Sequence, residues 1–104
     1  MPVYRRARCD TYTAEGVEKN LPVEVNIHDS GSIVVSYEWD GAHIVYNGNE
    51  IESGHFEVSA PRLKATATLH RFSGGDVPEG RWVSENEAGM WLIKLGKIDQ
   101  ENSN

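Results

Sequence analysis

Cysteine is nearly absent from this sequence: Cys9 stands alone, so the chain cannot form an intrachain disulfide bond. Small secreted domains often contain several such bonds. The sequence also has no apolar run typical of a signal peptide and none that approaches transmembrane length. We therefore expect a soluble protein of the cytoplasm, in which Cys9 is a buried and unreactive thiol.

Positive charge is also in short supply. The chain has 10 lysine and arginine residues against 16 aspartate and glutamate residues, which gives a net charge of −6. Nucleic acids and anionic membranes are bound through cationic surfaces. The charge therefore predicts that neither a nucleic acid nor a membrane is a partner of this protein.

Motifs for catalysis or metal binding are missing as well. The four histidines lack the spacing of a shared metal site, and no Gly-x-Ser-x-Gly nucleophile motif is present. Acidic residues fall mostly on outward positions of the expected strands, which leaves no buried pair for acid–base chemistry. The sequence therefore predicts no catalytic residue, no metal site and no cofactor, and an enzyme would need a site assembled across strands.

What the sequence does contain is an alternation of apolar and polar residues, interrupted by Gly, Asp, Asn and Pro. This period of two is typical of β-strands, and only residues 13–20 leave room for a helical turn. We predict a single all-β domain over residues 1–96, followed by a disordered polar tail at 97–104. The predicted strands are 3–12, 21–28, 32–39, 42–48, 54–59, 63–72, 80–86 and 90–96.

Two turns determine the strand register in the first half of the chain. Asp40 and Gly41 are typical of a two-residue type I′ hairpin, which pairs residue 39 with residue 42. Residues 29–31 fit a three-residue loop that ends in a left-handed glycine and pairs residue 27 with residue 33. Both registers place the same apolar side chains on one face of a three-stranded meander. This predicted inward face consists of Val23, Val25, Ile27, Ile33, Val35, Tyr37, Trp39, Ala42, Ile44 and Tyr46.

About eight short antiparallel strands joined by hairpins cannot form an open flat sheet without exposing both edges. An up-and-down meander that closes into a small barrel removes these edges. The connections are short, and none has the length of a Greek-key crossover. We therefore predict a closed barrel, with an open half-barrel and a two-layer sandwich as the alternatives.

Two Gly-x-Trp triplets, residues 80–82 and 89–91, lie in the C-terminal part of the chain. Together with the meander pattern they make the chain resemble the calycins, the small barrels that include lipocalins, avidins and fatty-acid-binding proteins. Calycins commonly carry such a triplet on the first strand, where its Trp packs across one end of the barrel. Here both triplets lie near the C-terminus, and the resemblance concerns architecture alone.

Large aromatic residues gather on the predicted inward face. If they line a pocket, Tyr37, Tyr46, Trp82 and Trp91 contact a small ligand through their rings and polar tips. Arg71 continues the inward row of residues 63–69 and is similar in position to the arginines with which fatty-acid-binding proteins hold a carboxylate. The leading hypothesis is therefore a noncatalytic binding module for a small, anionic ligand at a barrel mouth. The alternatives are that the aromatic residues only fill the core and that Arg71 reaches out to water.

The last predicted hairpin leaves an apolar patch outside the barrel. With a loop over residues 86–89, Val83, Met90 and Leu92 point outward together, and Val83 lies opposite Leu92. A contiguous exposed patch predicts an interaction surface, unless another part of the chain covers it. A symmetric homodimer is one use of such a surface. The alternative function is thus an interaction or homodimerising domain with a filled core.

Overall fold

The computed structural model describes residues 3–71, 75, 77–85 and 87–96, and these form an all-β protein of eight strands. A short 3-10 turn, η1 (Pro61–Leu63), is the one helical element among the described residues. The predicted tail at 97–104 lies outside them. The strands are β1 (Val3–Thr13), β2 (Gly16–Ile27), β3 (Ser32–Trp39), β4 (Ala42–Glu52), β5 (His55–Ala60), β6 (Ala65–His70), β7 (Glu79–Val83) and β8 (Ala88–Lys94).

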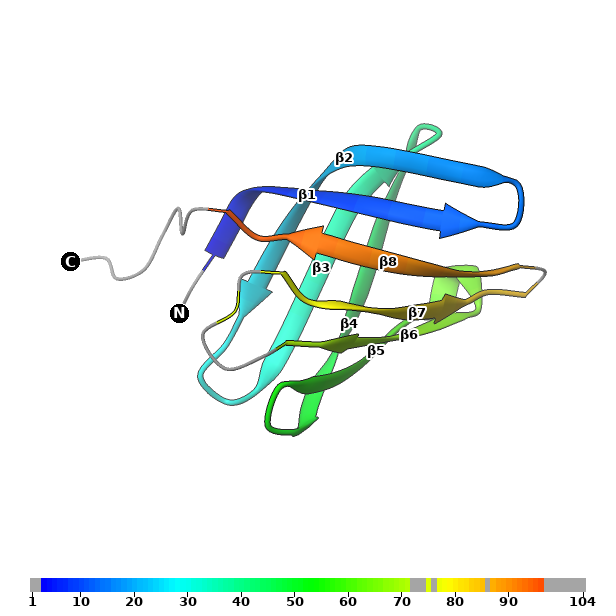
Figure 1. Cartoon of the computed structure of the whole chain (residues 1–104). Helices are drawn as coiled ribbons and strands as arrows, with labels where there is room; N and C mark the ends of the chain where they lie inside the picture. The colour runs from blue at the N-terminus through cyan, green and yellow to red at the C-terminus, as the bar shows by residue number, and fades with distance from the viewer. Residues whose placement is uncertain (1–2, 72–74, 76, 86, 97–104) are drawn as a thin grey trace.

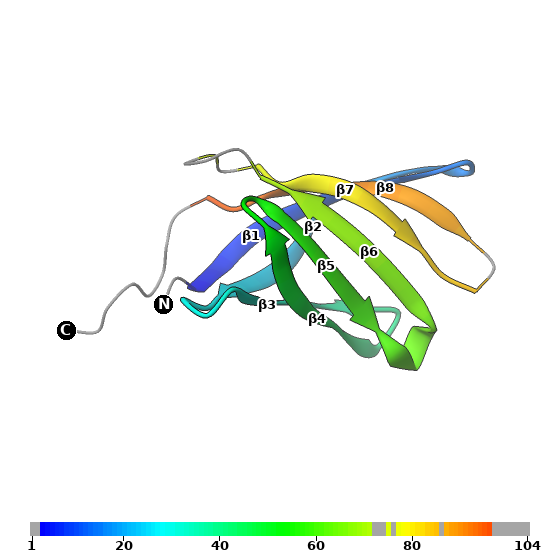
Figure 2. The same cartoon turned by 90° about the horizontal axis from the view of Figure 1, so that it is seen from below.

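The eight strands form a closed antiparallel barrel in which each strand pairs with the next along the chain, and β8 pairs with β1. Figure 1 shows β1 beside β8, and Figure 2 shows β4, β5, β6 and β7 following one another around the wall. Closure pairs every strand on both sides, which removes the exposed edges of an open sheet. The predicted closed meander is confirmed, and the half-barrel and the sandwich are excluded.

The register predicted from the two turns is confirmed. Trp39 pairs with Ala42 across a turn in which Asp40 and Gly41 have φ values of 52° and 80°. Ile27 pairs with Ile33, and the loop between them ends at a glycine with a φ of 98°. The turn residues therefore determined which side chains of β2, β3 and β4 face inward, because a two-residue period allows no other alternation.

Residues 13–20, the one stretch that left room for a helical turn, form no helix. Thr13 pairs with Gly16, so β1 and β2 continue as a long hairpin up to a tight turn. This hairpin has register shifts between Tyr4 and Ala7 and between Cys9 and Thr11. The predicted strands 3–12 and 21–28 fall largely within this hairpin, and the part that was not predicted is residues 16–20, which are all exposed and show no apolar alternation.

The predicted register of the last hairpin is wrong. Val83 pairs with Ala88 and not with Leu92, because the loop spans residues 84–87 and not 86–89. The backbone N–H of Ser84 donates to the carbonyl of Glu87 at 2.8 Å and closes this loop. Leu92 pairs with Glu79 instead. Residue 86, which the predicted loop included, is not among the described residues.

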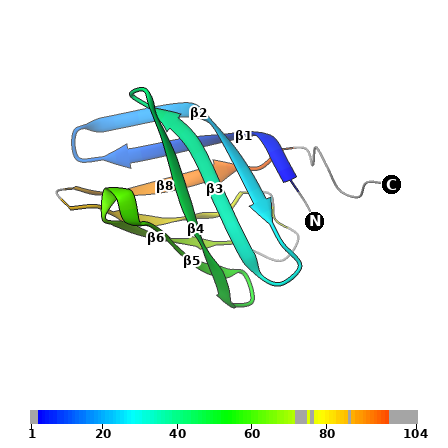
Figure 3. The same ribbon diagram turned by 180° about the vertical axis from the view of Figure 1, so that it is seen from behind.

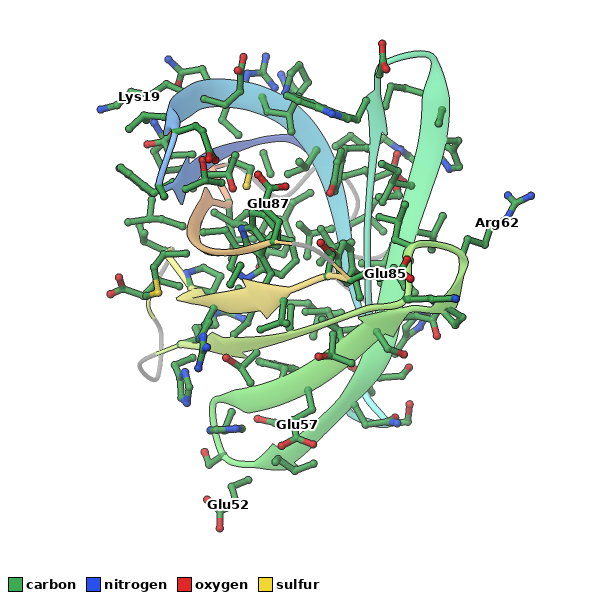
Figure 4. The ribbon with its side chains drawn as sticks, turned by 90° about the vertical axis from the view of Figure 1, so that its right-hand side faces the viewer. Lys19, Glu52, Glu57, Arg62, Glu85 and Glu87 are labelled. Carbon is green, nitrogen blue, oxygen red and sulfur yellow. The ribbon has the colours of Figure 1, made fainter. Side chains whose placement is uncertain are left out.

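The two ends of the barrel differ in their connections. In a meander, the links β1–β2, β3–β4, β5–β6 and β7–β8 lie at one end, which we call the mouth, and the other links lie at the far end. Figure 4 looks onto the mouth, and Figure 3 shows how β3 and β4 cross in front of the strands on the opposite wall. The core between the ends is apolar, with Val35, Leu69, Ile93 and Leu95 fully buried. No helix in the described part of the chain has the length and apolar character that crossing a membrane requires.

Candidate functional site

A pocket of about 690 Å³ opens at the mouth of the barrel. Its lining comes from β1, β2, β3, β4, β7 and β8, together with η1 and the β1–β2 and β7–β8 loops. Ligand pockets for small molecules commonly range from about 300 to 1,000 Å³. The barrel is therefore filled with apolar side chains toward the far end and opens into this pocket at the mouth.

Five aromatic side chains line the pocket: Tyr37, Trp39, Tyr46, Trp82 and Trp91. Tyr46 and Trp91 form its buried floor, with ring centroids 5.1 Å apart at an interplanar angle of 58°. Trp39 lies at the rim, where 45% of its surface remains exposed. The pocket thus offers aromatic surface from its floor to its opening.

The two Gly-x-Trp triplets form one cross-strand unit in the wall of the pocket. Antiparallel pairing sets Gly80 opposite Trp91 and Trp82 opposite Gly89. A Cβ atom at Gly89 would lie 2.7 Å from Cζ2 of Trp82, so the indole rests directly on this glycine. Gly89 therefore provides the space that the indole of Trp82 occupies, whereas Gly80 leaves room for the backbone of Thr68 on β6.

Each indole forms a hydrogen bond with a strand that is not its direct neighbour along the chain: Trp82 with β1 and Trp91 with β6. The Nε1–H of Trp82 donates to Oγ1 of Thr11 on β1 at 3.0 Å. The Nε1–H of Trp91 donates to the carbonyl oxygen of Thr68 on β6, also at 3.0 Å. The rings are thus held in fixed positions, and their polar atoms are already satisfied within the protein. The sequence predicted that Thr11 lies in a strand (3–12), but it did not predict Thr11 as a residue of the site.

The hydroxyl groups on the pocket floor are neutral at physiological pH. Burial raises the pKa of Tyr37, with the neighbouring Tyr46 as a second cause, and the two phenol groups share a hydrogen bond. Burial likewise raises the pKa of Tyr46. It also raises the pKa of the Cys9 thiol, which lines the pocket, to about 12. The floor therefore carries no charge.

The opening of the pocket is acidic. Glu15, Glu18, Glu85 and Glu87 belong to its lining, whereas no lysine, arginine or histidine does within the described part of the chain. Figure 4 shows Glu85 and Glu87 at the mouth, while Glu52 and Glu57 lie away from it. Sequence analysis did not reveal this gathering, because the residues come from two hairpin tips far apart in the chain.

Of the five predicted ligand-binding residues, the structure brings four together and separates one. Tyr37, Tyr46, Trp82 and Trp91 share the pocket, but Arg71 is not part of its lining. Arg71 follows β6 at the far end, where its backbone N–H donates to the carbonyl of Gly54 at 2.7 Å. Its Nε–H donates to the carbonyl of Gly75 at 2.7 Å. Arg71 thus holds two far-end loops beside the end of β6.

The three predicted interface residues lie on the outer surface, where Val83 and Met90 are exposed and Leu92 is half-buried. Val83 lies opposite Ala88 and Leu92 opposite Glu79, so Val83 and Leu92 are not the direct cross-strand pair of the predicted register. Met90 has Arg81 on one side and Tyr12 on the other, in a row across β7, β8 and β1.

Among the described residues, no group of three or more histidine, cysteine, aspartate or glutamate side chains is placed to hold a metal ion. The fold and the pocket thus define a small closed meander barrel that is hollow at one end. Comparison with known protein families, with curated proteins and with solved structures finds no match to this chain. Its function is therefore inferred from the pocket.

Proposed function

We propose that this protein is a noncatalytic binding module, and that a small molecule binds in the pocket at the barrel mouth. The observation that carries the proposal is a pocket of about 690 Å³ with aromatic side chains on its floor and at its rim. Aromatic surface contributes most of the binding energy in small-molecule sites, while a few polar groups orient the ligand. The likeness to calycin barrels, many of which hold a ligand within the barrel, supports the same function.

The state of the polar groups favours binding over catalysis. Burial keeps Cys9 and the two pocket tyrosines protonated, so none of them is an activated nucleophile or base. The indole N–H groups are bonded to Thr11 and Thr68. The pocket therefore offers a ligand mainly apolar and aromatic contact, together with the hydroxyl groups of its lining and the carboxylates of its rim.

Titration by NMR tests the proposal. We expect small molecules with an aromatic body of about ten heavy atoms to bind with Kd values of about 0.1–1 mM, the range that ligand efficiency sets for this size. Chemical-shift changes should concentrate on Tyr46 and Trp91. Leu21→Trp, which adds bulk to a half-buried wall residue, should abolish them.

The matched control is Val83→Trp, which adds the same ring on the outer surface of β7 and should leave binding unchanged. A set of cationic, neutral and anionic aromatic compounds that produces no shift at millimolar concentration would overturn the proposed function.

A further inference from the structure

We infer that the ligand of this pocket is a cation with an apolar body, such as a primary or quaternary alkylammonium with an aromatic or aliphatic chain. This inference rests on the proposed function and names the chemical class that the site selects. It depends on three properties of the pocket: the charge of its rim, the lack of a basic side chain in its described lining, and the aromatic faces that it exposes.

The rim carries negative charge that the protein itself neutralises only in part. Lys64 lies 3.8 Å from Glu85, and this is the one ion pair that the described residues provide to the four rim carboxylates. Lys19 and Arg62, which are labelled in Figure 4, point outward from this end. A ligand in the pocket therefore meets the carboxylates of Glu15, Glu18 and Glu87 at the opening.

Among the described residues, the floor has no positively charged group that would attract an anion. Anionic ligands are held by arginine, lysine or free N–H donors. The indole N–H groups of Trp82 and Trp91 are already used in hydrogen bonds at 3.0 Å, and no basic side chain lines the described part of the pocket. Arg71, the arginine that would favour an anion, lies at the far end beside Gly54 and Gly75.

The aromatic faces supply what a cation needs. Ammonium groups are attracted to the faces of Trp and Tyr rings, and the attraction grows when water is excluded. Trp39 and Trp82 are only partly buried, so their surfaces remain accessible from the pocket. A cation at the mouth can thus contact rings and carboxylates together, while its apolar chain reaches the floor formed by Tyr46 and Trp91.

The experiment compares three probes that share one body and differ in charge: 4-phenylbutylammonium, 4-phenylbutan-1-ol and 4-phenylbutyrate. Isothermal titration calorimetry at low salt should give a Kd for the cation about tenfold lower than for the alcohol. The anion should bind weakest. Raising the ionic strength should reduce the difference between cation and alcohol, because salt screens the rim carboxylates.

Glu18→Gln combined with Glu87→Gln removes two rim charges that have no ion pair within the described residues. We expect this variant to lose most of the preference for the cation and to retain its affinity for the alcohol. Glu52→Gln combined with Glu57→Gln is the matched control, since it makes the same change of charge away from the mouth (Figure 4). The control should keep the preference.

The outcomes separate the two proposals. Equal binding of cation and alcohol, or tightest binding of the anion, would overturn the inference about charge and leave the binding function in place. If the control variant lost the preference for the cation as well, the preference would depend on the net charge of the protein and not on the rim carboxylates. That result would also overturn the inference about charge. Binding of none of the three probes would contradict both proposals.

Discussion

At the scale of single residues, the seam where the barrel closes depends on a buried aspartate. Oδ1 of Asp10 accepts a hydrogen bond from the backbone N–H of Asn20 at 2.9 Å, and Oδ2 lies 3.6 Å from Nζ of Lys94. Nζ of Lys94 also donates to Oδ1 of Asn20 at 3.0 Å. One carboxylate on β1 thus links both neighbouring strands. The hydrogen bond from Asn20, followed by the charge of Lys94, lowers the pKa of Asp10 below its ordinary value of 3.8.

This shift makes the stability of the protein depend on pH. Because the folded-state pKa of Asp10 is lower than that of the unfolded chain, the carboxylate stabilises the folded state at neutral pH. That contribution is lost as the pH falls below 3.8 and through the folded-state pKa. We expect Asp10→Asn to lower the melting temperature at pH 7 and to weaken its dependence on acid, as measured by circular dichroism.

Asp40→Asn is the control for Asp10→Asn, because it removes the same charge from an exposed turn. Asparagine tolerates the left-handed conformation that residue 40 adopts at a φ of 52°, so the turn should persist. The role of Asp10 in the seam would be contradicted if both variants melted at the same temperature at pH 7.

The thiol of Cys9 gives a second prediction at this scale. Its side chain is buried, and its pKa is raised from 9.0 to about 12. Since the thiolate is the reactive species, folded Cys9 should react with a disulfide reagent at about pH 8 roughly a thousandfold more slowly than the unfolded chain. Absorbance at the wavelength of the released thiol measures both rates, with the unfolded rate obtained in guanidinium chloride. Similar rates in the two states would show that the barrel leaves Cys9 accessible.

At the scale of elements, the β7–β8 hairpin depends on its two glycines. A Cβ atom at Gly80 would overlap the carbonyl oxygen of Thr68, which accepts the indole bond of Trp91. We expect Gly80→Ala to reduce the free energy of unfolding by about 1–3 kcal/mol, as overpacking in a dense core does. Gly96→Ala is a useful contrast, because open space surrounds that position and only its φ of 72° opposes a side chain.

Urea unfolding followed by tryptophan fluorescence gives the free energies of both alanine variants. If Gly80→Ala were as stable as the parent protein, the contact between residue 80 and the backbone of Thr68 on β6 would not require a glycine. A loss of the near-ultraviolet tryptophan signal in the Gly80 variant alone would further locate the damage at the paired indoles.

The elements also show where sequence reasoning succeeds and where it fails. Turns with a residue that requires positive φ, such as Asp40-Gly41, determine register locally, and the pairing of β3 with β4 followed from that turn. The β7–β8 loop has no such residue among its described positions, and it was placed two residues too late. The tip of the β1–β2 hairpin, residues 16–20, could not be predicted, because these residues are all exposed and show no alternation of apolar and polar side chains.

At the scale of the whole molecule, the inward direction of the aromatic residues and a pocket among four of them could be predicted, but the volume and charge of that pocket could not. The alternation of apolar and polar residues indicates on which face of a strand a side chain lies. The volume of the pocket depends instead on the curvature of the barrel and on the end of the barrel at which each residue lies. Arg71 illustrates the difference: its row points inward, yet the strand carries it to the far end, away from the pocket. The acidic rim depends in the same way on closure, which brings the β1–β2 and β7–β8 hairpin tips to one mouth.

The oligomeric state is the last property that depends on the whole surface. In the observed register the exposed Met90 lies opposite Arg81, and Leu92 lies opposite Glu79. Charged side chains therefore interrupt the apolar surface around Val83, Met90 and Leu92. Stable homodimers bury at least about 1,200 Å² in total, with an apolar centre from which charge is depleted.

We accordingly expect the protein to remain a monomer at high micromolar concentration, as measured by light scattering coupled to size-exclusion chromatography. Met90→Glu should leave the measured molar mass unchanged, because Met90 is half exposed and a monomer has no interface that the glutamate could disrupt. Arg81→Leu is the informative variant: it removes the cation beside Met90, joins the apolar side chains of β7 and β8, and should promote association. A parent protein that forms dimers, together with a Met90→Glu variant that is monomeric and folded, would establish the outer face of this hairpin as an interface despite its charges.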